Sequence, residues 1–197
     1  MKVFGLTGQN FRNLTLTEFC PGPGVNILYG NNGQGKTNLL EALWLFTGSR
    51  SFRGAKDREM VTFGQKKTLL SMDFEGHRRQ QNARITIESR RTVNINGLDA
   101  QSPSRLAGHF CGVVFSPAHL SLIQGGPEGR RRFIDAAYCQ IRPGYIPIVF
   151  EYNRTLKQRN SLMRQMAADG RVALDLIEAW DNRLSQARFS LYKKLVR

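Results

Sequence analysis

The stretch from Gly30 to Thr37 constrains this chain more than any other, because it fits the phosphate-binding pattern G-x-x-x-x-G-K-[ST] at every fixed position. Its glycines let the backbone wrap closely around a polyphosphate, so that successive N–H groups point at the anion. Lys36 is expected to reach the β- and γ-phosphates, and the Thr37 hydroxyl to bind Mg²⁺. The predicted nucleotide contacts are Gly30, Asn31, Asn32, Gly33, Gln34, Gly35, Lys36 and Thr37.

The flanks of this loop support the interpretation. A β-rich run, Val25 to Tyr29, precedes it, and a helix-forming run, Thr37 to Phe46, follows it. Strand, loop and helix in this order are the context that a phosphate-binding loop requires. The alternative is a glycine-rich turn that only resembles one.

The charge balance points to a polyanionic partner. Across 197 residues, 29 Lys and Arg face 15 Asp and Glu, a formal net charge of +14. Such an excess favours nucleic acid, although a solvated cationic surface is also possible. Three scattered cysteines without C-x-x-C spacing argue against zinc or a disulfide framework. With no signal peptide or membrane-length apolar run, we expect a cytoplasmic protein that does not enter a membrane.

The distribution of turn signals predicts an α/β fold with a mixed sheet. Runs 3–8 and 13–19 are expected to be strands that lead into the loop strand at 25–29. Runs 68–74, 84–88 and 92–95 alternate apolar and polar residues and should form an antiparallel meander, closed by a turn at Asn96-Gly97. One more strand is expected at 112–115, and a helix beginning near Glu128.

The last part of the chain is expected to be helical. Apolar residues recur on alternating four- and three-residue steps, as in a coiled-coil seam, with a break at Asp169-Gly170. Two helices folding back on each other are predicted, although amphipathic helices against a globular core would give a similar pattern. We therefore expect a head over residues 1–142 and an arm over residues 143–197. The predicted seam residues are Tyr145, Val149, Tyr152, Leu156, Arg159, Met163 and Met166, then Ala173, Ile177, Trp180, Leu184, Ala187 and Leu191.

Catalytic groups are harder to find than the loop. Hydrolysis needs an acidic residue after an apolar strand, to hold Mg²⁺, and a group that orients water. Asp73 resembles such a residue only superficially, because its strand alternates like a half-exposed one, and Asp135 sits in a helical pattern. His77, His109 and His119 stand singly without ligand spacing. The sequence therefore predicts no catalytic residue in this chain.

Arginine clusters carry a second hypothesis. They fall on predicted loops, turns and a helix start, where side chains can reach phosphates. Because no base-reading motif is visible, sequence-independent DNA contact is expected, with a solvated face as the alternative for any one cluster. The predicted DNA contacts are Arg78, Arg79, Arg90, Arg91, Arg130 and Arg131; a further basic segment contains Arg50, Arg53, Lys56 and Arg58.

Several of these segments together resemble the bacterial RecF family of DNA replication and repair proteins. The resemblance runs in order over nearly the whole chain. The segments that carry it are Asn10 to Asn13, Gly30 to Ala42, Ser51-Phe52-Arg53, Phe115 to Leu120, Gly125 to Asp135, and Leu156 to Asn160. The last two are the most selective, since the loop alone is shared with many nucleotide-binding proteins.

The resemblance implies a P-loop ATPase head of the ABC and SMC type, here its lobe I with a short helical antiparallel arm. It implies ATP and Mg²⁺ as cofactors, with Thr37 on the metal and Arg12 near the nucleotide. In the RecF family, ATP joins two heads into a homodimer on single- or double-stranded DNA and at gaps. There the protein acts with RecO and RecR to load RecA in DNA-damage repair, replication and the SOS response.

This sequence differs from the pattern of the RecF family in two respects, which limit the properties that the resemblance implies for it. Ser116 falls near the position at which such heads carry a glutamine. The family's Leu-Ser-x-Gly-Gln signature and acidic Walker B strand are absent from this chain, so we expect lobe II to be missing. The complete protein should be a weak DNA-dependent ATPase and this chain nearly inactive. The rival interpretations are a small-molecule kinase with Asp73 as metal ligand, and a DNA-binding module with a vestigial loop.

Overall fold

The computed structural model describes residues 1–100, 102–169 and 174–195. The chain divides into two compact units, Met1–Ile141 and Arg142–Arg197. The predicted seam residue Ala173 and the break at Gly170 lie outside the described residues. In the part of the chain described, no helix is long and apolar enough to cross a membrane.

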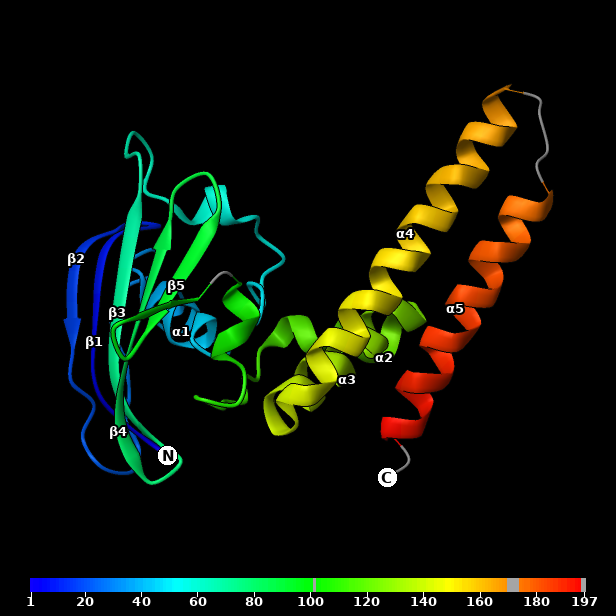
Figure 1. Cartoon of the computed structure of the whole chain (residues 1–197). Helices are drawn as coiled ribbons and strands as arrows, with labels where there is room; N and C mark the ends of the chain where they lie inside the picture. The colour runs from blue at the N-terminus through cyan, green and yellow to red at the C-terminus, as the bar shows by residue number, and fades with distance from the viewer. Residues whose placement is uncertain (101, 170–173, 196–197) are drawn as a thin grey trace. The chain divides into compact units, whose positions relative to one another are not determined.

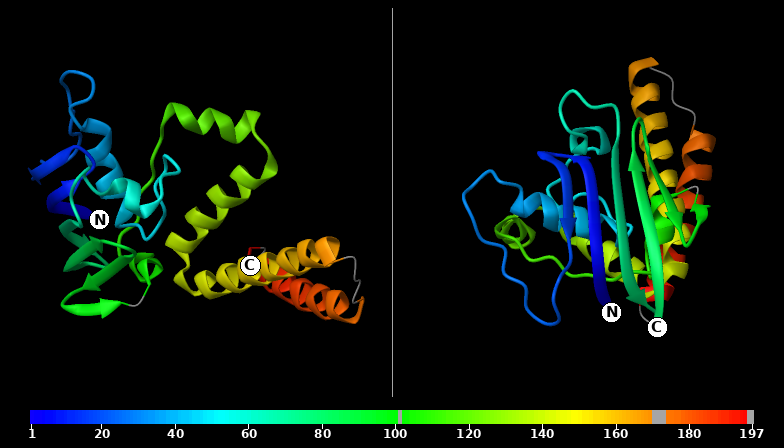
Figure 2. Two further views of the ribbon diagram at one scale, coloured as in Figure 1. Left: turned by 90° about the horizontal axis from the view of Figure 1, so that it is seen from above. Right: turned by 90° about the vertical axis from the view of Figure 1, so that its left-hand side faces the viewer.

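The first unit is built on one six-stranded antiparallel sheet with the strand order β2-β1-β3-β4-β5-β6. Figure 1 shows the strands, and the right-hand view of Figure 2 shows β1 and β2, in blue, side by side. Every pairing between neighbouring strands is antiparallel, so the sheet of the described residues is not the mixed sheet that was expected: the segment 25–29, which would have entered it as the loop strand, is irregular. The strands are β1 (Lys2–Phe11), β2 (Leu14–Phe19), β3 (Thr68–Gly76), β4 (Arg79–Ile87), β5 (Arg91–Ile95) and β6 (Leu98–Ala100).

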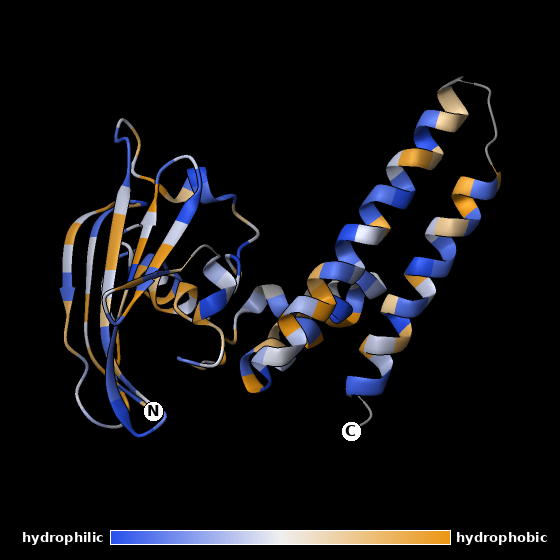
Figure 3. Cartoon of the chain, in the orientation of Figure 1, coloured by the Kyte–Doolittle hydropathy of each residue, from blue (hydrophilic) through white to orange (hydrophobic). Residues whose placement is uncertain are grey.

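Alternation in the sequence places the core on one face of this sheet. On β3, Leu70, Met72 and Phe74 are buried in turn while the residues between them are more exposed. The same alternation appears as orange and blue bands along the strands in Figure 3. Helix α1 (Lys36–Leu45) contributes Leu39, Ala42 and Leu45 to that core. The helix following the loop is thereby held against the buried face of the sheet.

The predicted meander and its closing turn are confirmed. Asn96 and Gly97 both have positive φ, 52° and 85°, as a two-residue type I′ hairpin turn between β5 and β6 requires. The expected strands at 25–29 and 112–115 are wrong, because both segments are irregular. A strand needs the backbone of a neighbour to bond with, and the observed sheet pairs with neither segment. Val25, Ile27, Tyr29, Val113 and Phe115 are all exposed.

Three 3₁₀ turns and two further α-helices complete the described part of the first unit. The 3₁₀ turns are η1 (Asp57–Met60), η2 (Pro103–Leu106) and η3 (Pro117–Leu120), followed by α2 (Ser121–Gln124) and α3 (Pro127–Ile141). Helix α3 begins at Pro127, one residue before the predicted start. Proline suits a first helical position because its missing N–H has no partner there in any case.

The second unit contains η4 (Pro143–Tyr145) and two helices, α4 (Ile146–Asp169) and α5 (Leu174–Leu195). The helices lie side by side and run in opposite directions (Figure 1). Predicted seam residues on α5, such as Trp180, Leu184 and Leu191, are half-buried. Two ion pairs cross between the helices: Arg159 Nε lies 2.8 Å from Asp181, and Arg183 Nη2 lies 2.6 Å from Glu151.

Candidate phosphate-binding site

The Gly30–Thr37 loop leads directly into α1. Gly30, Gly33 and Gly35 have positive φ values of 140°, 83° and 98°. Gly35 is the N-cap of α1, and Lys36 is its first helical residue. A β-carbon on Gly35 would lie 2.5 Å from Leu14 Cδ2 and would displace that side chain, and the Gly35 φ of 98° is one that L side chains rarely adopt, so this turn favours glycine. The glycine pattern of the sequence therefore corresponds to the backbone geometry of an anion-binding loop.

The loop lines a small cavity of about 270 Å³ that is open to solvent. Its lining is cationic or neutral, and no carboxylate faces it among the described residues. Both the N-terminus of α1 and the Lys36 ammonium favour an anion there. Lys36 Nζ donates to the carbonyls of Gly30 at 2.8 Å and Asn31 at 2.7 Å, which holds it across the loop. The lining residues are Asn32, Gly33, Gly35, Lys36, Thr37, Asn38 and Arg53.

These residues fit a polyphosphate. Backbone N–H groups, an ammonium and a helix N-terminus bind phosphate oxygens, and the Thr37 hydroxyl is a suitable Mg²⁺ ligand. Among the described residues, no cluster of three or more His, Cys, Asp or Glu side chains forms a metal site of its own. A metal at this loop would therefore share its ligands with the phosphates.

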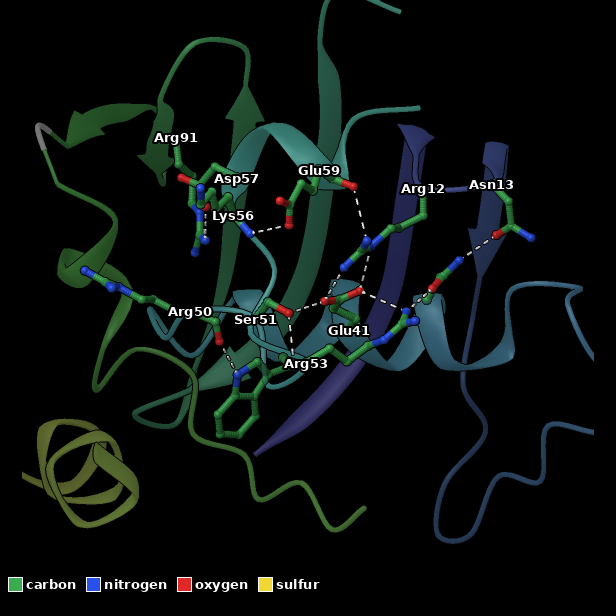
Figure 4. Close-up of polar contacts among 12 residues, drawn as sticks. Arg12, Asn13, Glu41, Arg50, Ser51, Arg53, Lys56, Asp57, Glu59 and Arg91 are labelled. Carbon is green, nitrogen blue, oxygen red and sulfur yellow. Dashed lines mark hydrogen bonds and ion pairs between the residues drawn. The ribbon is translucent and has the colours of Figure 1, made fainter. Parts of the chain in front are cut away.

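Glu41 is the principal site residue that the sequence analysis missed. It lies one helical turn after Thr37 and is fully buried. Figure 4 shows its carboxylate between Arg12, Ser51 and Arg53. Arg12 donates from Nε and Nη2 at 3.0 Å each, Ser51 donates its hydroxyl, and Arg53 Nη1 lies 3.6 Å away. A single acid inside the apolar run Leu39 to Leu45 was the available signal.

The two arginines beside Glu41 are placed differently. Arg12 was expected near the nucleotide, and its guanidinium is directed into the protein, with Nη1 bonded to the Glu59 carbonyl at 3.1 Å. Arg53 was grouped with the basic segment, and it lines the loop cavity and donates to Asn38 Oδ1 at 2.8 Å. Arg53 is therefore the arginine better placed to meet a bound phosphate.

A wider groove of about 1280 Å³ adjoins the loop cavity and shares Asn38 and Arg53 with it. Arg12 lines this groove, together with the fully exposed ring of Phe63 and residues near the β4–β5 turn. The cavity and the groove together offer room beyond that of a phosphate group.

The predicted DNA contacts do not gather on one surface. Arg78 and Arg79 lie at the β3–β4 turn, and Arg90 lies at the β4–β5 turn, which is at the opposite end of β4. Arg91 is buried, with Nη2 2.5 Å from Asp57 and Nη1 2.8 Å from the Ser49 carbonyl.

The arginines of α3 are exposed and carry different contacts. Arg130 Nη1 donates to the carbonyls of Leu122 at 3.1 Å and Gly125 at 2.9 Å, which tie it to the end of α2. Arg131 is exposed on the same helix. Arg78, Arg79, Arg90 and Arg131 are thus the candidates whose exposure suits a phosphate contact.

The remaining candidates lie away from the loop. Asp73 is in the middle of β3, accepts from Asn82 Nδ2 at 2.7 Å, and lines neither the cavity nor the groove. Ser116 donates its N–H to His119 Nδ1 at 3.1 Å, and its hydroxyl is buried without a partner among the described residues. Burial and the neighbouring His77 lower the pKa of His109, whose Nδ1 lies 2.8 Å from Gln81 Oε1.

Comparison with known proteins shows that this chain is similar to the AAA-domain family and to RecF proteins. The profile of the AAA domain matches residues 6–174. The DNA replication and repair protein RecF of Caldanaerobacter subterraneus subsp. tengcongensis is 37% identical over 185 residues, covering 90% of this chain and 50% of that protein. RecF of Lachnoclostridium phytofermentans is 37% identical over 198 residues, covering 98% of this chain and 54% of that protein.

A solved structure of the recombination mediator protein RecF with ATP, in the RecFOR pathway, is also similar. It matches with a TM-score of 0.88 at 32% identity and covers 98% of this chain and 52% of that one. The resemblance to RecF and the α/β head fold are therefore confirmed. The chain spans about half the length of the curated relatives it matches.

Proposed function

Because this chain belongs to the AAA-domain family, we propose that it is the ATP-binding half of a RecF-like DNA replication and repair protein. The observation that carries the proposal is the Gly30–Thr37 loop at the start of α1, which lines a cavity in which the structure describes no carboxylate. Residues 1–142 act as lobe I of the head, and residues 143–197 as its arm.

The loop residues bind and orient the nucleotide. Lys36 exchanges the Gly30 and Asn31 carbonyls for phosphate oxygens, a change that a flexible side chain makes without moving the backbone. The Thr37 hydroxyl holds Mg²⁺, which when bound neutralises charge on the β- and γ-phosphates. Arg53, at the cavity wall, adds a second cation. The groove beyond Arg53 leaves room for the nucleoside.

Titration with Mg-ATP, with and without Lys36→Ala, tests this function. Loss of a charge-assisted contact to phosphate should weaken binding by more than about tenfold. Lys67→Ala is the matched control, because Lys67 is exposed and lines neither the cavity nor the groove. Equal affinity in all three proteins, or no affinity in any, would mean that the loop is vestigial.

Hydrolysis is not expected from this chain alone. In the part of the chain that the structure describes, no acidic residue lines the cavity, and the acidic strand and signature of the RecF family are absent from the sequence. A small-molecule kinase is less well supported, since Asp73 is bonded to Asn82 away from the loop. Rapid phosphate transfer to a small acceptor, lost in Asp73→Asn, would favour the kinase instead.

DNA is the proposed macromolecular partner, bound without sequence preference as single strands, duplexes or gaps. The net charge of +14 supports this proposal. If several phosphates are contacted, affinity should fall by orders of magnitude over a few-fold rise in salt. Flat salt dependence would exclude this mode of binding. An ATP-dependent homodimer, RecO and RecR as partners, and a cytoplasmic location are proposed by likeness to RecF.

A further inference from the structure

Glu41 is an unusual residue to find beside a phosphate-binding loop. Its side chain is fully buried, one turn after Thr37 on the helix whose N-terminus faces the cavity. A carboxylate at this place repels the anion that the loop attracts, and its burial costs several kcal/mol unless it is paired. Glu41 is paired, so its burial is compensated, but its repulsion of the anion does not help phosphate binding and the position of the carboxylate requires another explanation.

The contacts of Glu41 join three separate segments. Arg12 comes from the turn after β1, while Ser51 and Arg53 come from the loop after α1. The Ser51 hydroxyl also accepts the backbone N–H of Arg53 at 3.1 Å. Glu41 is therefore connected to the backbone of Arg53 through Ser51, and to the Arg53 side chain directly.

The two arginines are not held equally. Arg12 donates hydrogen bonds from Nε, Nη1 and Nη2 to protein oxygens, and its side chain is 18% exposed. Arg53 is 45% exposed, donates from Nη1 to Asn38 Oδ1 at 2.8 Å, and lies at the longer distance of 3.6 Å from the carboxylate. Arg12 thus anchors Glu41 (Figure 4), whereas both side-chain contacts of Arg53 are made by Nη1, which leaves Nε and Nη2 for the cavity that Arg53 lines.

We propose that Glu41 is a positioning residue of the nucleotide site, which holds Arg53 at the wall of the cavity in the orientation that meets phosphate. The inference rests on the proposed ATP binding and adds a residue that does not touch the ligand. In this arrangement, the order that Glu41 imposes on Arg53 outweighs its repulsion of the phosphates.

Replacing Glu41 with a neutral residue distinguishes positioning from simple electrostatics, because the two explanations predict opposite changes in Mg-ATP affinity. If Glu41 acted only through its charge, Glu41→Gln would remove a repulsion and tighten Mg-ATP binding. If Glu41 positions Arg53, the same variant should weaken binding, by about tenfold when one charge-assisted contact is lost. Glu18→Gln is the matched control, because it removes an equal charge from an exposed position on β2.

A double-mutant cycle tests whether Arg53 carries the effect. Mg-ATP affinity is measured for the wild-type chain, Glu41→Gln, Arg53→Ala and the double variant, with thermal unfolding of each without ligand. The effect of Glu41→Gln should nearly vanish in the Arg53→Ala background. Tighter binding, or an equal loss in both backgrounds, would overturn the proposal.

A milder variant covers the case in which Glu41→Gln does not fold. Ser51→Ala leaves the charge pair intact but removes one bond to Glu41 and one to the Arg53 backbone. It should weaken Mg-ATP binding about threefold in the wild type, because the backbone N–H of Arg53 loses its neutral hydrogen bond to the Ser51 hydroxyl, and not in Arg53→Ala. Unchanged affinity of a folded Ser51→Ala chain would count against positioning. Absence of binding by the wild type would instead refute the proposed function itself.

Discussion

At the scale of single residues, Gly35 shows how closely the loop is packed. Its φ is 98°, and a β-carbon there would lie 2.5 Å from Leu14 Cδ2 and 3.0 Å from Asn13 Oδ1. We expect Gly35→Ala to lower the free energy of unfolding by about 2–4 kcal/mol, from backbone strain and overlap together. Urea denaturation measures this change, and Mg-ATP affinity should fall with it.

Gly64 provides the matched comparison for that substitution. It has a similar φ of 79°, but a β-carbon there meets nothing within 4 Å. Gly64→Ala should therefore show the strain alone, about 1 kcal/mol. Equal losses at the two positions would contradict the steric argument for Gly35.

The cysteines give a prediction about pH. Burial, with the Asp135 charge in second place, raises the pKa of the Cys139 thiol to about 11. Because the raised pKa favours the neutral thiol, only about 0.1% of Cys139 is the reactive thiolate at pH 8. Cys20 is exposed and should react first with a thiol reagent, with Cys139 last. Mass spectrometry of partly labelled protein gives the order, and labelling of Cys139 as fast as Cys20 would contradict it.

At the scale of elements, the β4–β5 turn separates two adjacent arginines that look equivalent in sequence. Arg91 is buried and ties β5 to η1 through Asp57 and to Ser49 after α1. Arg90 is exposed. Arg91→Ala should cost about 2 kcal/mol in stability, since it leaves the partly buried Asp57 without this cation. Arg90→Ala should change stability by less than about 0.5 kcal/mol.

The effects of the same two substitutions on DNA affinity are expected to be reversed, with the larger direct effect at Arg90. Arg90→Ala should reduce DNA binding, because an exposed arginine can reach phosphate. Arg91→Ala should act only through stability. Thermal unfolding and DNA titration of both variants, at one salt concentration, check this. A stable Arg91→Ala protein would show that the contact with Asp57 contributes little.

What the sequence could predict depended on whether local pattern determined the element. Strands β3 to β5 and the Asn96-Gly97 turn follow from alternation and turn chemistry. The loop and α1 follow from the phosphate-binding pattern at Gly30 to Thr37, whose glycines allow the backbone conformation that the loop requires. The cluster at Glu41 could not be predicted, because Arg12 and Ser51 lie 29 and 10 residues away from it in sequence. Segments 25–29 and 112–115 have strand composition but no neighbouring strand, so local pattern misled there.

At the scale of the whole molecule, a large positive charge coexists with exposed apolar segments. Val25, Ile27 and Tyr29 are 80–91% exposed, and Val113 and Phe115 are 91–95% exposed. Apolar surface of this extent favours association, whereas a net charge of +14 opposes it. Salt screens the charge and leaves the apolar contact. We therefore expect the chain to self-associate more strongly as salt rises, while its DNA binding weakens.

Sedimentation at increasing salt, with binding of an apolar fluorescent dye, measures that balance. The double variant Ile27→Ser, Phe115→Ser should lower dye fluorescence by about half and keep the chain monomeric at high salt, since it removes exposed apolar area. Its free energy of unfolding should stay within about 0.5 kcal/mol of the wild type, because neither side chain is buried. Leu16→Ser, at an exposed position on β2, is the control. A wild-type chain that stays monomeric at high salt and binds no dye would show that these segments are covered in solution.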